Sequence, residues 1–396
     1  IGHHIYESRW LRNPEYLNQI IHTWYRGNEG GPMAKMTKFS SWNADAVLGR
    51  YMVDGNKEFL LDMVKDLEAE YARWEKTNRL PNGLYWQGDV QDGMEESISG
   101  GRRKQYARPT INSYMYGNAK ALSLIGIMTG DEGMAMKNGL KADSIKTLVQ
   151  DKLWNTDHHF FETMRGDASA EVREAIGYIP WYFNLPDASS KYTVAWKEVM
   201  DEKGFSAPYG LTTAERSHPE FRTHSVGKCE WDEAIWPFAS AQTLTAMANF
   251  MNNYPQTVLT DSVYFHHMER YVESQHHRGR PYIGEYLDEV TGYWLKGDQE
   301  RSRYYNHSTF NDLMITGLIG LRPRMDNTVE VNPLIPEGKW DYFCLDNVLY
   351  HGRNLTILWD KDGSRYQRGK GLHIYVDGKE VGHADTLTRV LCENVL

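Results

Sequence analysis

NSYMYGNAKALSLIGIMTGDEGMAMKNGLKADSIKTLVQDK, residues 112–152, consists of two runs with helical periodicity that are separated at Gly130-Asp131. Apolar residues recurring every three to four positions predict helices, here over residues 112–129 and 132–152. Glycine suits the end of the first helix, and aspartate suits the head of the second. This stretch therefore predicts a hairpin of two helices.

Helical periodicity recurs from the start of the chain to about residue 320, and loops rich in glycine, proline and aromatic residues separate the runs. Asn13-Pro14 fits a cap followed by proline at the first helical position. The other expected helices span residues 14–26, 42–54, 57–76, 170–183, 190–202, 232–252, 259–275 and 307–320. At least ten paired helices predict a mainly α fold, a toroid of helical hairpins.

The pattern changes after Leu321, where three β-rich segments follow at residues 328–332, 354–359 and 372–379. The last segment runs into Asp377-Gly378, a dipeptide typical of tight hairpin turns. We therefore expect two domains, a helical body over residues 1–321 and a small β-rich subdomain over residues 322–396. No linker-like segment separates them, so the two are expected to pack together.

Composition limits the function classes. The 396 residues carry a net charge of about −9 and no long basic run, so nucleic acid is not an expected partner. Cys229, Cys344 and Cys392 allow at most one disulfide, which excludes a disulfide scaffold. Without a CxxC pair or an HExxH motif, no metal and no cofactor are expected. No apolar run approaches the ~20 residues that span a membrane.

The chain opens on Ile1-Gly2-His3-His4 without an initiator methionine or a signal-like segment. We therefore expect a processed, trimmed or excerpted chain, and the residues do not indicate a compartment or an oligomeric state.

Two acidic segments set among aromatic residues lie about 190 residues apart. They are YWQGDVQDGMEES at residues 85–97 and GEYLDEVTGYW at residues 284–294. Sugar rings stack their apolar faces on Trp and Tyr, and their hydroxyl groups hydrogen-bond to acids. Glycoside hydrolysis requires two such carboxylates that face each other. The pair of segments therefore predicts a carbohydrate-active site.

The surroundings of both segments offer further candidates. Gly88, Gly93, Gly100 and Gly101 predict an irregular loop that displays an acid. Other side chains could line the same cleft, although each could equally cap a helix or fill the core. These are Arg108, Asn112 and Tyr116 after the first segment, His307 after the second, and the Trp-acid groups Trp42 with Asp45 and Trp231 with Asp232 and Trp236.

Several of these motifs resemble trehalase-like and family 63-like glycoside hydrolases. Gly93-Met94-Glu95-Glu96-Ser97 resembles their Gly-Trp-Asp-x-Ser motif, which carries the general acid. The stretch from Glu285 to Gly292 resembles Glu-Asn-Tyr-x-x-x-Thr-Gly, which carries the general base. Residues 39–45 resemble the Ser-Trp-Asp element that binds substrate, and residues 231–237 match Trp-x-x-x-x-Trp-Pro.

The resemblance covers roughly residues 1–320 and implies an (α/α)6 barrel followed by a C-terminal sheet. The chain departs from the pattern at Glu95, where the family has Asp, at Met94, where it has Trp, and at Asn306-His307-Ser308, where it has Phe-Ser-Trp. With these departures the chain resembles a divergent bacterial branch that includes family 142-like β-L-arabinofuranosidases. The resemblance also implies a periplasmic or secreted protein.

On this basis we predict an inverting, exo-acting glycoside hydrolase with a carbohydrate substrate. Glu95 would protonate the leaving oxygen, with a raised pKa, and Glu285 would activate water from the opposite face, so the two carboxyl groups should stand ~6.5–9.5 Å apart. Glu96 is the second candidate for the acid and Asp89 the third. The substrate-binding candidates are Trp42, Asp45, Trp86, Asp89, Glu96, Arg108, Asn112, Tyr116, Trp231, Asp232, Trp236, Trp294 and His307.

Two alternatives stay open at this point. A carbohydrate-binding barrel that has lost catalysis would keep the aromatic residues without two opposed carboxylates. A polysaccharide lyase or epimerase on a helical toroid would need a Tyr or His base near a basic residue, and His307, Arg108 and Tyr116 allow that interpretation.

Overall fold

The computed structural model describes residues 1–223, 228–305 and 308–396, which form two compact units. The first unit comprises Ile1, Trp24–Asp45 and Val64–Ser308. The second comprises Gly2–Thr23, Ala46–Met63 and Thr309–Leu396. Both units are therefore discontinuous in sequence. The expected domain boundary after residue 321 is continuous and stays a prediction.

Helices dominate the chain up to residue 320. The α-helices are α1 (Gly2–Ser8), α2 (Glu15–Arg26), α3 (Asn43–Asp54), α4 (Lys57–Asn78), α5 (Asp89–Asp92), α6 (Pro109–Thr129), α7 (Glu132–Lys152), α8 (Ile179–Tyr182), α9 (Ser190–Thr193), α10 (Pro237–Asn253), α11 (Asp261–Ser274) and α12 (Phe310–Leu313). Short 3-10 segments η1 (Ala175–Tyr178), η2 (Val194–Val199) and η3 (Glu300–Ser302) and one π-helical turn, η4 (Met314–Leu318), accompany them.

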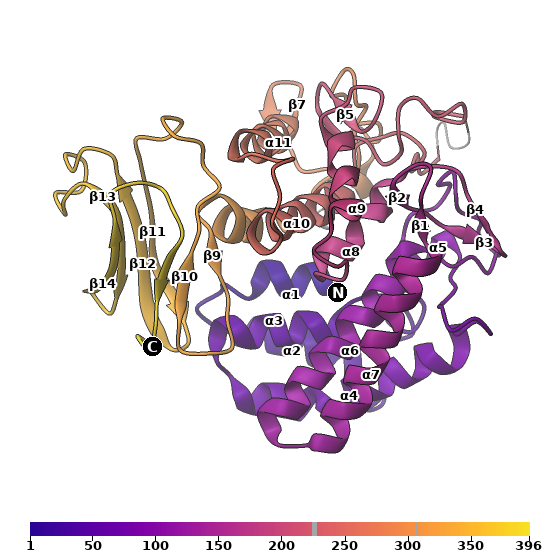
Figure 1. Cartoon of the computed structure of the whole chain (residues 1–396), viewed down its shortest axis with the longest axis horizontal. Coiled ribbons are helices and arrows are strands. Elements are labelled where there is room, and N and C mark those ends of the chain that lie inside the picture. The colour runs from indigo at the N-terminus through magenta and orange to yellow at the C-terminus, as the bar shows by residue number, and fades with distance from the viewer. Residues whose placement is uncertain (224–227, 306–307) are drawn as a thin grey trace. The chain divides into compact units, whose positions relative to one another are not determined.

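The predicted hairpin of residues 112–152 is confirmed as α6 and α7, which pack side by side (Figure 1). Gly130 ends α6 with φ +75°, a left-handed conformation that glycine adopts without steric cost. The Asp131 carboxylate accepts a hydrogen bond from the Met134 N–H at 2.9 Å and so caps α7. The two residues that separate the runs in the sequence thus make the turn.

Two of the expected helices are shorter than predicted and partly 3-10 helical. Residues 170–183 contain only η1 and α8, because Glu174 is extended and pairs with Ala214 in an isolated β-bridge. Residues 190–202 shorten to α9 and η2. The expected helix at 307–320 begins partly outside the described residues and is seen as α12 followed by the η4 turn.

Small two-stranded pairs join the loops of the first unit. They are β1 (Trp154–Asn155) with β2 (Phe160–Phe161), β3 (Met164–Arg165) with β4 (Ala168–Ser169), β5 (Ser206–Ala207) with β6 (Gly210–Leu211), and β7 (His276–His277) with β8 (Arg280–Pro281). All four pairs are antiparallel.

Two antiparallel sheets form the β-rich part of the second unit (Figure 1). One has the strand order β15-β10-β9, from β9 (Leu321–Arg322), β10 (Val329–Val331) and β15 (Val390–Cys392). The other has the order β11-β12-β13-β14, from β11 (Tyr342–Tyr350), β12 (Arg353–Asp360), β13 (Gly371–Val376) and β14 (Lys379–Ala384). The expected β-rich tail is confirmed.

The Asp377-Gly378 turn is also confirmed. It joins β13 to β14, with φ of +48° at Asp377 and +78° at Gly378. Positive φ at both central residues is the geometry that follows the twist of a two-residue hairpin.

Residues from the start of the chain complete the second unit. The Arg9 guanidinium forms a buried ion pair with the Asp312 carboxylate at 2.8 Å, and the Trp10 indole N–H donates to the same carboxylate at 2.7 Å. The His351 N–H donates to the Val53 carbonyl at 2.7 Å. The β-rich part therefore packs with segments that precede it by about 300 residues in sequence.

No helix among the described residues combines the length and the apolar character needed to cross a membrane.

Candidate active site

The loop that carries Glu95 belongs to the first unit and begins with the single turn of α5. Gly93 ends this turn in the left-handed region, with φ +77°, and Glu96 also has a positive φ of +69°. Residues with positive φ thus stand on either side of Glu95 and give this part of the loop an irregular path. The glycine-rich sequence of the loop had predicted this irregular path.

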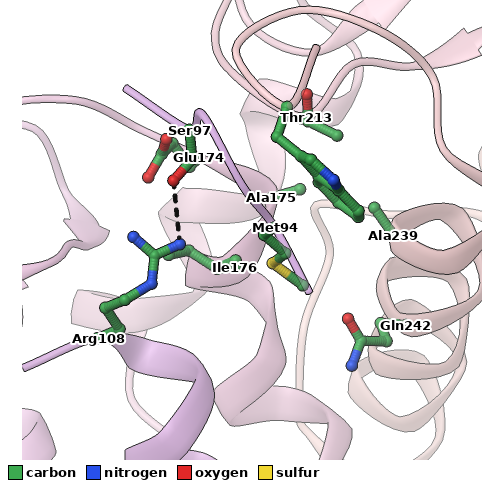
Figure 2. Close-up of a pocket in the computed structure, with 10 residues that line it drawn as sticks. Met94, Ser97, Arg108, Glu174, Ala175, Ile176, Thr213, Ala239 and Gln242 are labelled. Atoms are coloured by element: carbon green, nitrogen blue, oxygen red, sulfur yellow. Dashed lines mark hydrogen bonds between the residues drawn. The ribbon is translucent and has the colours of Figure 1, made fainter. Parts of the chain in front are cut away.

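A buried hydrogen-bond network around Arg108 holds the loop that carries Glu95. The Arg108 side chain is 0% exposed and donates to the Asp92 carboxylate at 2.8 Å, to the Ser99 hydroxyl at 3.1 Å and to the Ser97 hydroxyl at 3.2 Å. Figure 2 shows the contact between Arg108 and Ser97. Since Asp92, Ser97 and Ser99 surround Glu95 in sequence, Arg108 holds the loop on both sides of Glu95.

Glu174 and Thr110 complete this network. The Glu174 carboxylate accepts hydrogen bonds from the Ser99 N–H at 3.1 Å and from the Ser99 hydroxyl. Thr110 donates its hydroxyl to Asp92 at 2.8 Å. Burial raises the pKa of Glu174, and the neighbouring Arg108 charge lowers it in part. Arg108 was predicted to bind substrate, whereas its contacts here give it a role in holding the acid loop.

The segment that carries Glu285 is fixed by backbone pairing and by stacking. Ile235 and Leu287 exchange two N–H to carbonyl hydrogen bonds of 3.0 Å. The Trp236 ring stacks between Trp231 and Tyr286, with ring centroids 4.2 and 4.4 Å apart. The Ser302 hydroxyl donates to the Glu285 carboxylate at 2.8 Å. The stacking of Tyr286 and the pairing of Leu287, directly after Glu285, and the hydrogen bond from Ser302 therefore set its position.

Both carboxylates act on the same two neighbours. The charges of Glu95 and Glu285 each raise the pKa of the Cys229 thiol, after the larger effect of burial. Burial and then the same two charges raise the pKa of the Tyr305 hydroxyl. Two segments about 190 residues apart in sequence thus converge within the first unit. Neither Cys229 nor Tyr305 was among the predicted site residues.

Glu95 has the electrostatic character of an acid. Its pKa is raised, first by burial, which a backbone hydrogen bond partly opposes; the charge of Asp92 raises it further, Arg102 lowers it, and Asp89 has the smallest effect, also upward. Glu96 instead forms an ion pair with Arg102 at 3.0 Å. Of the two adjacent glutamates, Glu95 is therefore better suited to hold a proton.

Asp89, the third candidate, is buried, and burial raises its pKa. One of its carboxylate oxygens accepts the Glu96 N–H at 3.2 Å. This hydrogen bond to the backbone of Glu96 indicates that Asp89 supports the conformation of the loop.

Most of the predicted tryptophan platforms are covered by other side chains. Trp42 is buried against Tyr114 and Tyr182, and Trp294 is buried against Tyr282 with its N–H donated to the His276 carbonyl at 2.8 Å. Trp236 has a ring on each face. A stacking role for these three is not supported here. Of the five predicted tryptophans, two differ from these three. Trp86 is half-buried, and Trp231 is buried but lines a cavity.

The remaining predicted side chains divide in the same way. Asn112 is buried, and its amide bonds the Tyr85 N–H, the Tyr85 carbonyl and the Arg108 carbonyl at 2.8–2.9 Å, so it supports the backbone. Tyr116 is buried, and burial raises its pKa to about 12. Asp45 is half-buried in the first turn of α3, and Asp232 is buried beside Trp231. His307 lies outside the described residues.

A second acidic cluster was not predicted. Arg222 contacts the carboxylates of Glu233 at 3.2 Å, Asp288 at 2.9 Å, and Glu289. Burial raises the pKa of Glu233 to about 8, and a hydrogen bond with Glu230 adds to the effect. The cluster joins residues 222–233 to the segment after Glu285. Among the described residues, no group of three His, Cys, Asp or Glu side chains is arranged to hold a metal ion.

The helix-rich first unit matches a sequence profile of glycoside hydrolase domains. The sequence profile described as "Mannosylglycerate hydrolase MGH1-like glycoside hydrolase domain" matches residues 1–308. The chain therefore belongs to this family of glycoside hydrolase domains. A second profile, "Glycosyl hydrolase family 65, C-terminal domain", matches residues 321–383. The predicted membership of the glycoside hydrolases is confirmed.

Solved structures add relatives. A protein named "Sialidase" is 82% identical with a TM-score of 0.99, and the match covers 100% of this chain but 36% of that one. The chain thus spans about a third of that protein's length. A GH63 mannosylglycerate hydrolase from Thermus thermophilus, in complex with Tris and D-glycerate, is 10% identical with a TM-score of 0.57 over 79% of this chain and 91% of that one.

An uncharacterized conserved protein from the same organism is 12% identical, with a TM-score of 0.59 over 74% of this chain and 87% of that one. At such low identity these two likenesses concern the fold alone.

Proposed function

We propose that the chain is an inverting, exo-acting glycosidase in which Glu95 is the general acid and Glu285 the general base. The observation that carries the proposal is the convergence of both carboxylates on Cys229 and Tyr305. Glu95, with its raised pKa, suits protonation of the leaving oxygen. Glu285 accepts a hydrogen bond from Ser302, which holds the carboxylate of the proposed base in place.

The architecture proposed for this site is an (α/α)6 barrel made of the helical hairpins. Its support is the hairpin of α6 and α7 together with the likeness in fold to the GH63 hydrolase. The expected separation of the two carboxyl groups is ~6.5–9.5 Å, which leaves room for the attacking water. The name "Sialidase" does not assign a substrate to this chain, which matches 36% of that protein.

The experiment compares Glu285→Gln and Glu95→Gln on 4-nitrophenyl glycosides and on plant and microbial oligosaccharides. Removing the base should lower turnover on every substrate by ~10²-fold or more. Removing the acid should lower turnover strongly where a sugar alcohol leaves and weakly where a nitrophenolate leaves, because the phenolate needs little protonation. NMR of the first product should show inversion at the anomeric carbon.

The exposed Glu300→Gln is the control and should retain activity. Near-native activity of Glu95→Gln on an oligosaccharide would transfer the acid role to Glu96. A product with retained anomeric configuration would refute the inverting mechanism. Sugar binding without hydrolysis of any glycoside would favour the alternative of an inactive binding barrel.

A further inference from the structure

A small, partly enclosed cavity lies next to the acid loop. Its volume of about 10 Å³ has room for roughly one water molecule. Every residue on its wall is exposed by 8% or less. Figure 2 shows the polar members of the wall, with Arg108 and Glu174 on one side and Gln242 on the other. The wall is formed by Met94, Ser97, Arg108, Glu174, Ala175, Ile176, Thr213, Trp231, Ala239 and Gln242.

Within the part of the chain that the structure describes, three buried polar atoms on this wall lack a hydrogen-bond partner. They are the Thr213 Oγ1, the Trp231 Nε1 and the Gln242 Oε1. Gln242 donates its amide N–H to the Tyr114 hydroxyl at 2.8 Å, which fixes the direction of the amide. Buried polar groups are normally paired, so three unpaired atoms around one water-sized space indicate a missing partner.

The chemistry of the three atoms defines that partner. The Trp231 N–H is only a donor, the Gln242 oxygen is only an acceptor, and the Thr213 hydroxyl can act as either. A hydroxyl group satisfies all three because it both accepts and donates. A carboxylate could not donate to Gln242, and it would also lie close to the Glu174 carboxylate on the same wall. A methyl or methylene group would leave all three unpaired.

The cavity also borders both catalytic segments. Met94 and Ser97 lie on either side of Glu95 and its neighbour in sequence. Trp231 belongs to the aromatic stack that continues through Trp236 to Tyr286, next to Glu285. A group in this cavity therefore contacts residues of the acid loop and the first ring of the aromatic stack that leads to Glu285.

We propose that this cavity binds one hydroxyl group of the sugar ring whose bond is cleaved. The Trp231 N–H donates to the hydroxyl oxygen, the Gln242 oxygen accepts its proton, and Thr213 provides the third hydrogen bond. A water molecule fills the same place when no sugar is bound. This inference rests on the proposed function, and it identifies the substrate class as a sugar with a neutral hydroxyl at one required ring position.

The test uses the 4-nitrophenyl glycoside that the wild-type chain hydrolyses best, together with the set of its monodeoxy analogues. A site built to hydrogen-bond a hydroxyl discriminates strongly against the analogue that lacks it. For one ring position, kcat/KM should fall by about 10²-fold or more. Thr213→Val and Gln242→Met should reduce that ratio at least tenfold. Equal kcat/KM for all deoxy analogues in the wild type would overturn the proposal.

Thr212→Val is the matched control, because the buried Thr212 hydroxyl is already donated to the Ala214 carbonyl at 2.7 Å. It should lower the melting temperature without changing the deoxy ratio. Loss of discrimination in Thr212→Val as well would make the effect one of stability and refute the site.

Failure of the proposed function has a separate signature. If the wild type hydrolyses no glycoside, binding of free monosaccharides is measured by saturation-transfer NMR. Binding that is lost in Thr213→Val and Gln242→Met, but kept in Thr212→Val, supports the hydroxyl site without catalysis. Binding that all three variants keep, or no binding of any monosaccharide, overturns the inference.

Discussion

Glu95 is in a setting where function and stability oppose each other. Burial raises the pKa of its carboxyl, so the folded protein binds the proton more readily than the unfolded chain does. Stability contributed by such a group is highest below the unfolded-state pKa, about 4.3, and falls as the pH rises through the folded-state pKa. The ionised Glu95 carboxylate therefore lowers the free energy of unfolding at neutral pH.

We predict that Glu95→Gln raises the melting temperature at pH 7 relative to wild type, because the variant buries no charge. The gain should shrink near pH 4, where the wild-type carboxyl is largely protonated in both states. Thermal unfolding at both pH values measures this. Glu96→Gln should show no gain, since it loses the ion pair with Arg102. A gain at pH 4 equal to that at pH 7 would rule out the electrostatic cause.

At the scale of elements, the acid loop depends on one buried ion pair. Arg108 and Asp92 are both 0% exposed and lie 2.8 Å apart, whereas Arg102 and Glu96 in the same loop are 55% and 22% exposed. Removing one partner of a buried pair leaves an uncompensated charge, which costs about 3–5 kcal/mol. An exposed pair contributes about 0–1 kcal/mol.

We therefore expect Arg108→Met to lower the free energy of unfolding by about 3–5 kcal/mol and Arg102→Met by less than about 1 kcal/mol. Urea denaturation followed by tryptophan fluorescence compares the two variants. Similar small losses in both would show that Arg108 does not hold the loop.

Helices that begin and end at clear capping residues could be predicted from the sequence. Helix boundaries that depend on pairing with a distant segment could not. Gly130-Asp131 fixes the break between α6 and α7 through local geometry. By contrast, the apolar residues before 183 looked helical, yet Glu174 pairs with Ala214, which lies 40 residues further along the chain. A periodic pattern contains no information about such a partner.

The candidate site shows the same division. Glu95 and Glu285 could be found from acids beside aromatic residues, and the structure brings their segments together. The tryptophans were harder to assign, since Trp beside an acid describes both a sugar platform and a core residue. Trp236 stacks on Trp231 and Tyr286, so its ring faces are covered as those of a core residue are. Thr213 and Gln242 belong to no recognisable sequence motif, so their position at one cavity could not be predicted; only the folded chain brings them together.

At the scale of the whole molecule, the β-rich part shares its compact unit with residues 2–23 and 46–63. The Arg12 guanidinium bonds the Asn347 carbonyl at 2.7 Å, and the His351 ring bonds the Met52 carbonyl at 2.9 Å. A cut after residue 321 would remove these partners.

We predict that a chain of residues 1–321 loses protection from amide hydrogen exchange in residues 2–23 and 46–53, because their packing partners are gone. Mass spectrometry of exchanged peptides measures this against the full chain. Residues 132–152 of α7, which belong to the other unit, are the internal reference. Unchanged protection in all three segments would mean that the β-rich part is an independent domain.

The thiol of Cys229 offers a way to observe the site without any sugar. Only the thiolate is alkylated, and the charges of Glu95 and Glu285 both hold the thiol pKa up. In a Cys344→Ser background, which removes the exposed cysteine, iodoacetamide should therefore react faster with Glu95→Gln and with Glu285→Gln than with the parent. Identical rates in all three would contradict the convergence of the carboxylates. The alkylation rate of Cys229 therefore responds to the negative charges of both glutamates, and it can be measured in the protein without substrate.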